Sequence, residues 1–325
     1  MKLIIQIPCY NEAETLPLTV AELPQHISGI TCLETLIVDD GSKDGTGTIA
    51  KTLGINHIIR HPRNLGLAQA FQTGLDAALQ RGADIIVNTD GDNQYPGEYI
   101  PELVAPILRG EADIVIANRQ VDGIEHFSPM KKLLQKLGSW TVRTVSGTDV
   151  PDAVSGFRAY SRDAALRLNI LTRFSYTLDT IIQAGKMGLI VESIPVHTNG
   201  PTRPSRLQRS MWHFIKAQAG TILRLYAFYE PLRTFSYIAL PFMLAGIYTW
   251  LRFIYFYLMR GGYTGLIQSI TIGTGLLLVG ALIFLFGVQA DITSKHRQLT
   301  QEALYRLKKL ELSQNQPTSK PTNPS

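Results

Sequence analysis

The chain has 325 residues, more than a single hydrophobic core usually holds, so an α/β domain plus a smaller part is expected. Its net charge is +5, but charged residues nearly vanish between Arg233 and Asp291. Basic residues flank this apolar block, which is typical of segments that border a membrane on its cytosolic side. They are not interleaved with aromatic residues as in nucleic-acid-binding modules, so the composition argues against a nucleic-acid partner.

The first part of the chain alternates short apolar runs with amphipathic stretches. Residues 3–7 and 34–38 are typical of buried parallel strands, and residues 14–26 between them have helical character. The alternation continues with expected strands at 55–60, 84–89 and 113–117 and expected helices at 67–81 and 99–109. This pattern predicts a doubly wound, mostly parallel sheet, in which ligands bind outside the carboxyl ends of the strands.

The segments that complete this part extend to residue 206. They are, in chain order, an amphipathic helix at 130–146, a polar turn at 147–152, an apolar stretch at 154–160, a helix at 178–186 and a strand at 189–195. Residues 198–206 carry two prolines and two arginines and predict a mobile loop that binds phosphate. Residues 1–206 are therefore expected to form one catalytic α/β domain.

Two long apolar segments follow. Residues 234–259 and 266–290 are each long enough to cross a hydrocarbon core, which needs about 20 residues. The link at 260–265 is short, so the two spans predict an antiparallel transmembrane hairpin. The preceding residues, 207–233, predict an amphipathic helix in the membrane interface, with a soluble surface helix as the alternative. The tail, 291–325, is expected to be helical at first and disordered at its end.

The distribution of Lys and Arg predicts the orientation of the hairpin. Basic residues are more numerous at its two outer flanks than in its turn, which places both flanks in the cytosol. Residues 1–10 include an apolar run that ends before it reaches signal-peptide length. We therefore expect an integral protein of a bacterial inner membrane, with its catalytic part and both termini in the cytosol.

The strongest motif is Asp90-Gly91-Asp92, which directly follows a predicted buried strand. Two carboxylates separated by one small residue can hold Mg²⁺ or Mn²⁺, whose remaining ligands are diphosphate oxygens. Gly91 would allow the phosphates to approach the backbone closely. A solvated turn is the alternative, because Asp-Gly is also common in turns.

Two further polar clusters follow other strands of the same predicted sheet. Pro8-Cys9-Tyr10-Asn11-Glu12 ends the first strand, and Asp39-Asp40-Gly41-Ser42 ends the second. Their carboxylates can accept hydrogen bonds from a nucleobase or a ribose, and Tyr10 can line the base. The three clusters together predict a site for a nucleotide whose phosphates are bound through a cation.

These motifs resemble those of the inverting family 2 glycosyltransferases with a GT-A fold, and in particular the branch that acts on polyprenyl phosphates and includes dolichol-phosphate mannosyltransferases. The resemblance covers roughly residues 1–210, and the two-span hairpin is similar to the anchor of many members. Besides the clusters above, it rests on Asp44-Gly45-Thr46, Asn64-Leu65-Gly66, Gln94 and Ser155-Gly156-Phe157-Arg158.

The resemblance implies a role for each matching residue on the donor side. The nucleotide-sugar donor, linked to UDP or GDP, would be bound by Pro8, Tyr10, Glu12, Asp39, Asp40 and Gly91. The metal cofactor, Mg²⁺ or Mn²⁺, would be held by Asp90, Asp92 and Gln94. Arg203 and Arg206 would stabilise the departing nucleoside diphosphate. Pro204 and Arg206 stand where many relatives have glycine and lysine, which puts the closing motion of this loop in doubt.

On the acceptor side, the resemblance implies that Arg119, Ser155 and Arg158 contact a phosphate. Asp152 matches a position proposed as general base or as organiser of the acceptor site, and Asp149 competes with it for this role. A lipid phosphate is already ionised at neutral pH, so it needs no strong base. Asp152 would then mainly orient other groups.

The implied reaction is an inverting displacement that moves a sugar from the nucleotide to a polyprenyl phosphate at the membrane. Members with such a hairpin suggest a homo-oligomer, for example a tetramer. Two alternatives stay open at this point. One is a transferase with a saccharide acceptor in cell-wall or surface-polysaccharide synthesis, and the other is a non-catalytic, membrane-tethered protein that binds nucleotide sugars. The sequence does not identify the sugar or the nucleotide.

Overall fold

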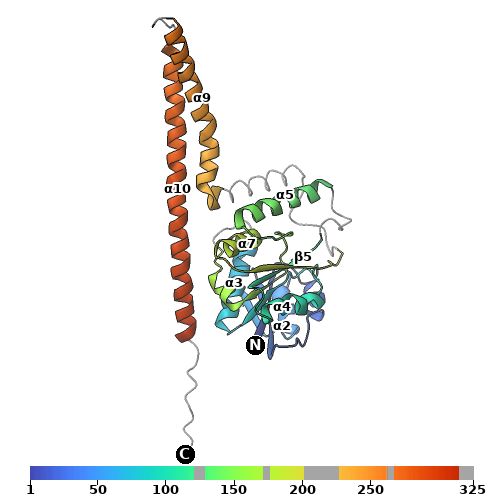
Figure 1. Cartoon of the computed structure of the whole chain (residues 1–325). Helices are drawn as coiled ribbons and strands as arrows, with labels where there is room; N and C mark the ends of the chain where they lie inside the picture. Colours follow the sequence, from blue (N-terminus) through green and yellow to red (C-terminus); the bar gives the residue numbers. More distant parts are fainter. Residues whose placement is uncertain (121–128, 171–175, 201–226, 261, 263–266, 315–325) are drawn as a thin grey trace, which may run out of the picture. The chain divides into compact units, whose positions relative to one another are not determined.

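The computed structural model describes residues 1–120, 129–170, 176–200, 227–260, 262 and 267–314, except for the side chains of 129–137 (Figure 1). It divides into two compact units, residues 1–218 with 302–325, and residues 219–301. Arg203 and Arg206, most of the expected interfacial segment at 207–233 and the last residues of the tail lie outside the described residues.

A seven-stranded sheet forms the centre of the first unit, in the order β3-β2-β1-β4-β6-β5-β7. All neighbouring strands are parallel except that β6 is antiparallel to both β4 and β5. The predicted mostly parallel sheet is confirmed. The strands are β1 (Lys2–Cys9), β2 (Cys32–Asp39), β3 (His57–Arg60), β4 (Ile85–Asn88), β5 (Ile114–Asn118), β6 (Arg158–Ser161) and β7 (Val191–Pro195).

Helices cover both faces of this sheet, as expected for β-α alternation. The alternate residues Leu3, Ile5 and Ile7 of β1 belong to a buried apolar cluster that also contains residues of α1 and α4. On the other face, α3 packs against β1 and β2. The described helices of this unit are α1 (Leu16–Ala21), α2 (Thr46–Thr52), α3 (Leu67–Gln80), η1 (Gly97–Tyr99), α4 (Ile100–Leu108), α5 (Pro129–Ser146), α6 (Arg162–Arg167) and α7 (Tyr176–Lys186).

The antiparallel strand β6 decides where the segment before it lies. Because β6 runs opposite to β4 and β5, its first residue lies at the edge where those two strands end; Arg158 pairs with Asn88 and with Ile116. The chain that precedes β6, residues 152–157, therefore reaches the same edge as the segments that follow β1, β2, β4 and β5. The apolar stretch expected at 154–160 contributes only its last three residues to the strand.

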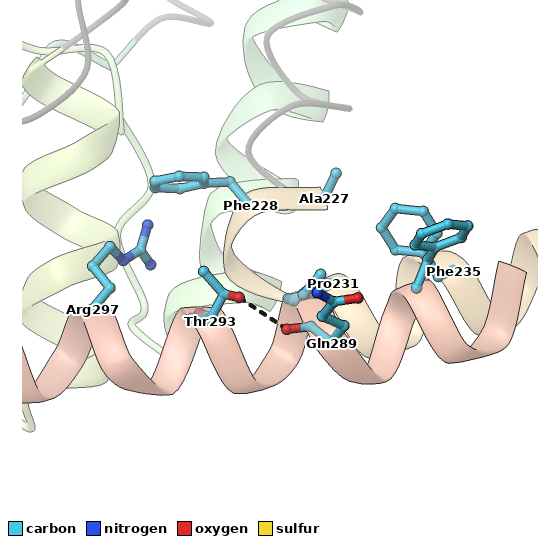
Figure 2. A pocket seen from close by; sticks show the side chains of 10 residues that line it. Ala227, Phe228, Pro231, Phe235, Gln289, Thr293 and Arg297 are labelled. Atoms are coloured by element: carbon cyan, nitrogen blue, oxygen red, sulfur yellow. Dashed lines mark hydrogen bonds between the residues drawn. The ribbon is translucent and has the colours of Figure 1, made fainter. Parts of the chain in front are cut away.

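The second unit contains an antiparallel helical hairpin of α9 (Pro231–Met259) and the first part of α10 (Ile267–Gln314). Both helices are long and apolar enough to cross a membrane. Glycines bring them close: a Cβ on Gly246 would lie 2.7 Å from Leu277, and one on Gly280 would lie 2.6 Å from Met243. The unit also contains a groove at the start of α9 (Figure 2).

Helix α10 is much longer than the span expected at 266–290. It continues to Gln314 and so includes the predicted helical tail, because the sequence has no Gly or Pro between Val288 and Gln314. Its last turns belong to the first unit. There, Tyr305 donates a hydrogen bond of 2.7 Å to Asp163, and Lys308 pairs with Asp76 at 2.8 Å.

Candidate active site

The segments that follow β1 and β2 brace each other through backbone-to-side-chain hydrogen bonds. The backbone N–H of Asn11 donates to Ser42 Oγ at 2.9 Å, and that of Glu12 donates to Thr46 Oγ1 at 3.0 Å. Pro8 and Glu12 are buried beside these contacts, whereas Tyr10 is 38% exposed. The bracing therefore holds two of the predicted clusters together and leaves the Tyr10 ring accessible to a ligand.

Asp39 and Asp40 have different surroundings. Both Asp40 oxygens are used inside the protein, because they accept hydrogen bonds from His61 Nδ1 at 2.7 Å and from the backbone N–H groups of Leu65 and Gly66. Asp39 is fully buried; its Oδ1 accepts from Ser42 N, and its Oδ2 lies 3.3 Å from Arg60 Nε without a hydrogen bond among the described residues. Asp40 thus shapes the loop before α3, and Asp39 keeps one oxygen for a further donor.

The loop after β4 places two carboxylates one residue apart. Burial, and after it the neighbouring charge of Asp92, raise the pKa of Asp90 to about 7 against the opposing effect of Arg119. A cation between the two carboxylates would remove this cost, so the residues present fit a divalent metal. Among the described residues no group of three or more His, Cys, Asp or Glu side chains can hold a metal by itself. The remaining ligands would come from Gln94 and from the phosphates of a nucleotide.

Gly91 is needed for packing as well as for access. A Cβ on this residue would lie 2.9 Å from Cys9 Sγ, at the end of the neighbouring strand β1. The Gly91 carbonyl also accepts a hydrogen bond of 2.8 Å from Thr15 Oγ1. The fit of this loop against β1 is therefore a second reason for glycine at position 91, besides the expected approach of phosphates.

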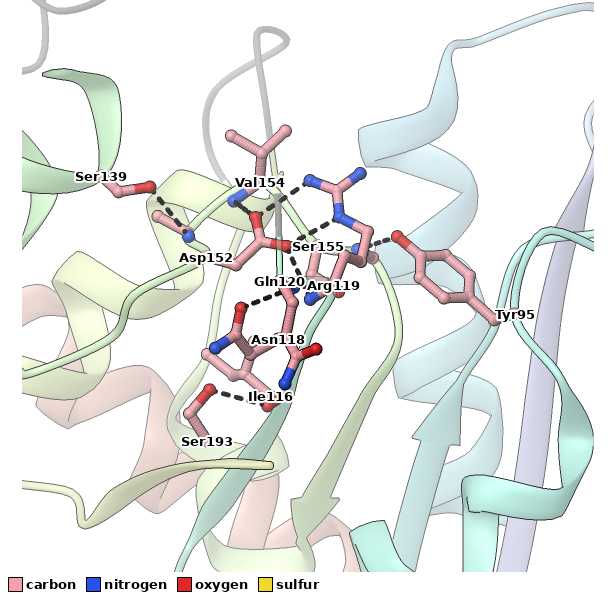
Figure 3. A network of polar contacts seen from close by, with 12 residues as sticks. Tyr95, Ile116, Asn118, Arg119, Gln120, Ser139, Asp152, Val154, Ser155 and Ser193 are labelled. Carbon is pink, nitrogen blue, oxygen red and sulfur yellow. Dashed lines mark hydrogen bonds and ion pairs between the residues drawn. The ribbon is translucent and has the colours of Figure 1, made fainter. Parts of the chain in front are cut away.

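Arg119 and Asp152 form a buried bidentate ion pair on the other side of the site (Figure 3). Arg119 Nε donates to Asp152 Oδ2 at 2.7 Å, and Nη2 donates to Oδ1 at 2.9 Å. Burial opposes the charge of Arg119, but Tyr95 and the hydrogen bonds to Asp152 outweigh it, so the pKa of Arg119 lies above its usual value. The two hydrogen bonds fix the Arg119 side chain. Asp149, in contrast, has a side chain that is 98% exposed.

Arg158 does not fit the expected contact with an acceptor phosphate. Its side chain is fully buried, and its guanidinium donates to the carbonyl groups of Ser155, Thr177 and Ala153 and to Thr180 Oγ1. These bonds hold the segment before β6 in place. Ser155 is also fully buried, and its hydroxyl has no hydrogen-bond partner among the described residues. Arg158 thus supports the site from inside the unit, and the phosphate contact expected for Ser155 stays a prediction.

Three polar residues behind the site were not expected from the motifs. Asn88, at the end of β4, accepts from Gln6 Nε2 at 2.9 Å and donates to the Gly156 carbonyl at 2.8 Å. It also donates to the Tyr176 hydroxyl at 3.2 Å. Gln6 and Asn88 interrupt otherwise apolar strands, and this interruption is the signal in the sequence that points to them.

The backbone is strained at the same edge. Asn11, Asn93 and Gln120 are the non-glycine residues with positive φ among the described residues, at 54°, 56° and 48°. Each lies in the segment that follows β1, β4 or β5. Such residues cluster at functional sites, where the surrounding structure holds them in an unfavourable conformation. The side chain of Asn199 joins this edge by donating to the Asn93 carbonyl at 3.0 Å.

This sheet, with paired carboxylates after β4 and a fixed arginine after β5, defines the class: a glycosyltransferase with a GT-A fold. The family model described as Glycosyl transferase family 2 matches residues 4–168, and the chain belongs to this family. The enzyme class and the fold predicted from the motifs are thereby confirmed.

Relatives and a solved structure extend the comparison. An undecaprenyl-phosphate mannosyltransferase of Micrococcus luteus is 30% identical over 60% of this chain and 83% of the relative. A UDP-N-acetylglucosamine–dolichyl-phosphate N-acetylglucosaminyltransferase of Methanococcus voltae is 31% identical over 59% of this chain and 83% of the relative. Glucosyl-3-phosphoglycerate synthase of Mycobacterium tuberculosis, solved with Mn²⁺ and UDP, matches with a TM-score of 0.54 and 19% identity over 70% of this chain and 79% of that chain. The last likeness concerns the fold.

Proposed function

We propose that this glycosyltransferase transfers a sugar, with inversion, from a nucleoside diphosphate to a polyprenyl phosphate in the membrane. The observation that carries the proposal is the arrangement of one sheet edge, where Asp90 and Asp92 lie after β4 and the fixed Arg119 lies after β5. The carboxylates suit a cation with a diphosphate, and the arginine suits a second phosphate. Two relatives named for transfer to lipid phosphates support the same assignment.

On the donor side, Asp39 is the proposed acceptor for an N–H of the nucleobase. Among the described residues its Oδ2 has no hydrogen-bond partner and lies 3.3 Å from Nε of Arg60, whose side chain is 62% exposed. Tyr10 is the proposed stacking partner for the base, and Pro8 and Glu12 shape the pocket beside it. Asp40 keeps the neighbouring loop in shape and so acts on the donor indirectly.

The diphosphate is proposed to lie at the loop after β4. A bound Mg²⁺ or Mn²⁺ would neutralise the charge that develops on the leaving nucleoside diphosphate. Asp90, Asp92 and Gln94 would hold that ion, and Arg203 and Arg206 are proposed to bind the leaving group's oxygens. A cation at Asp90 would stabilise its charged form, which is unfavourable without one because the pKa of Asp90 is raised to about 7.

On the acceptor side, an oxygen of the lipid phosphate attacks the anomeric carbon while the bond from that carbon to the diphosphate breaks. The electron pair of this bond leaves with the nucleoside diphosphate. Arg119 is proposed to position the acceptor phosphate, and Asp152 to hold Arg119 through its two hydrogen bonds. No side chain needs to remove a proton, because the attacking phosphate is already ionised.

The hairpin of α9 and α10 is proposed to anchor the enzyme where such a lipid is available. With the basic flanks of the hairpin in the cytosol, the acceptor head group would meet the donor on the cytosolic side. We also propose that the enzyme assembles into a homo-oligomer, as we expect for family members that are anchored by such a hairpin.

The test is a transfer assay with purified full-length enzyme in detergent. UDP- and GDP-sugars are supplied with Mn²⁺ or Mg²⁺, with and without polyprenyl phosphate, and the Asp92→Asn variant is the control. Lipid-dependent transfer that is lost in the variant would support the proposal and identify the donor. Metal-dependent turnover without lipid would favour a saccharide acceptor, and binding without turnover would favour a binding protein.

A further inference from the structure

A groove of about 560 Å³ lies within the second unit, between the start of α9 and the middle of α10 (Figure 2). Its walls are apolar at one end, where Phe235 and Phe286 face it. Towards the other end the lining from α10 becomes polar, with Gln289, Thr293 and Arg297 spaced four residues apart. Residues with this spacing lie along one face of a helix, so the groove changes from apolar to cationic along its length.

Arg297 lies at the polar end without a carboxylate partner among the described residues. Its guanidinium carbon lies 3.9 Å from the ring centre of Phe228 and 4.6 Å from that of Tyr229. Its Nε is buried and makes no hydrogen bond with any described residue. The basic residues near it are different, because Arg233 pairs with Glu230 and Lys295 pairs with Asp291. Two aromatic rings therefore hold a cation with at least one hydrogen-bond donor, Nε, that no described residue uses and that an anion could accept from.

We propose that this groove binds one anionic diacyl phospholipid of the surrounding bilayer. Its phosphate would lie at Arg297, and one acyl chain would run along Phe235 and Phe286. The gradient of the lining matches an amphiphile with an anionic head group, and the cytosolic leaflet is the one rich in such lipids. The proposal commits to phospholipid because helices in a bilayer are surrounded by it, whereas a polyprenyl phosphate is a minor component. The inference rests on the membrane placement proposed above.

The experiment is native mass spectrometry of the full-length enzyme, extracted with mild detergent from vesicles of equal parts phosphatidylglycerol and phosphatidylcholine. We expect the wild type to retain phosphatidylglycerol about fivefold over phosphatidylcholine, the effect of one cation near an anionic head group. Arg297→Gln is expected to abolish this preference. Lys295→Gln removes the same charge from an ion-paired residue outside the groove lining and is expected to keep it.

Arg297→Lys keeps the charge and is expected to restore most of the preference, which separates loss of the anion site from misfolding. The proposal would be overturned if Arg297→Gln kept the wild-type preference for phosphatidylglycerol, or if Lys295→Gln lost that preference to the same extent as Arg297→Gln. The proposal would also be overturned if equimolar polyprenyl phosphate displaced phosphatidylglycerol and the KM for polyprenyl phosphate rose in Arg297→Gln. The occupant of the groove would then be the acceptor. Sugar transfer by Arg297→Gln in detergent is expected to match the wild type. Lipid retention without any sugar transfer by the wild type would refute the proposed function and leave the lipid site standing.

Discussion

Asp152 is held in a way that suits orientation better than proton transfer. Both of its oxygens accept hydrogen bonds from Arg119, and only 3% of its side chain is exposed. The same two hydrogen bonds give the buried guanidinium its counter-charge. At the scale of single residues, this geometry favours the second of the two roles expected for Asp152, that of an organiser of the site, over that of a base.

Replacing Asp152 with Asn is expected to lower the free energy of unfolding by about 3–5 kcal/mol, because it leaves the buried Arg119 unpaired. The KM for polyprenyl phosphate should rise in the same variant. Urea unfolding and steady-state kinetics measure the two effects, and Asp149→Asn, at a side chain that is 98% exposed, serves as the matched control. Unchanged stability together with loss of the acidic limb of the pH–rate profile would instead identify Asp152 as a base.

Asp90 should make the cation-free protein less stable as the pH rises. The unfolded chain releases this proton near pH 4, whereas the folded protein holds it until about pH 7. Stability is therefore lost between these two values and is not regained above them. Asp90→Asn is expected to raise the free energy of unfolding at pH 8 by on the order of 1–4 kcal/mol, and by less at pH 5. Urea unfolding in EDTA measures this, and an equal gain at both pH values would contradict it.

At the scale of elements, the loop after β4 is shaped by the strand beside it. Gly91 faces Cys9 so closely that no Cβ fits between them without movement. Gly91 is not among the left-handed glycines, so its backbone would accept another residue if space were available. Packing between β1 and this loop, more than backbone conformation, requires glycine here.

Gly91→Ala is accordingly expected to displace the two carboxylates and to weaken Mn²⁺ binding about tenfold, a cost of about 1–3 kcal/mol that is typical of overpacking. Adding Cys9→Ala removes the clashing sulfur and should restore most of the affinity, so the two changes are non-additive. Titration calorimetry with Mn²⁺ and UDP measures the cycle. Gly138→Ala, where nothing lies within 4 Å of the added Cβ, is the neutral control. Additive effects of the two substitutions would show that the phosphates, and not Cys9, require Gly91.

The elements themselves were predictable where the signal is local. The strands that carry the motifs are continuous apolar runs, and the motifs follow them directly, so the sheet edge could be predicted from the sequence. The direction of β6 could not, because four residues do not encode whether a strand pairs in parallel or antiparallel. The burial of Arg158 could not be predicted from the sequence either, because arginine is rarely buried and the hydrogen-bond partners of Arg158 come from other segments of the chain.

At the scale of the whole molecule, the proposed topology has a direct test. Cys9 is buried and Cys32 is exposed, so Cys32 can report the side on which the first unit lies. In intact cells, a membrane-impermeant maleimide is expected to leave Cys32 unlabelled and to label Arg260→Cys, at the turn of the hairpin, in a Cys32→Ser background. The reason is that basic flanks are retained in the cytosol. Labelling of Cys32 from outside the cell would indicate the opposite orientation.

The position of β6 in the sheet also constrains the order in which the first unit can fold. β5 and β7 join the other strands only through β6, which comes after β5 in the chain. On the ribosome, β1 to β4 with the clusters proposed to bind the nucleotide can therefore pair as soon as they emerge, and Arg119 must wait until residues 158–161 have been made. In a nascent chain, the part of the site proposed for the nucleoside would therefore form before the part proposed for the lipid phosphate.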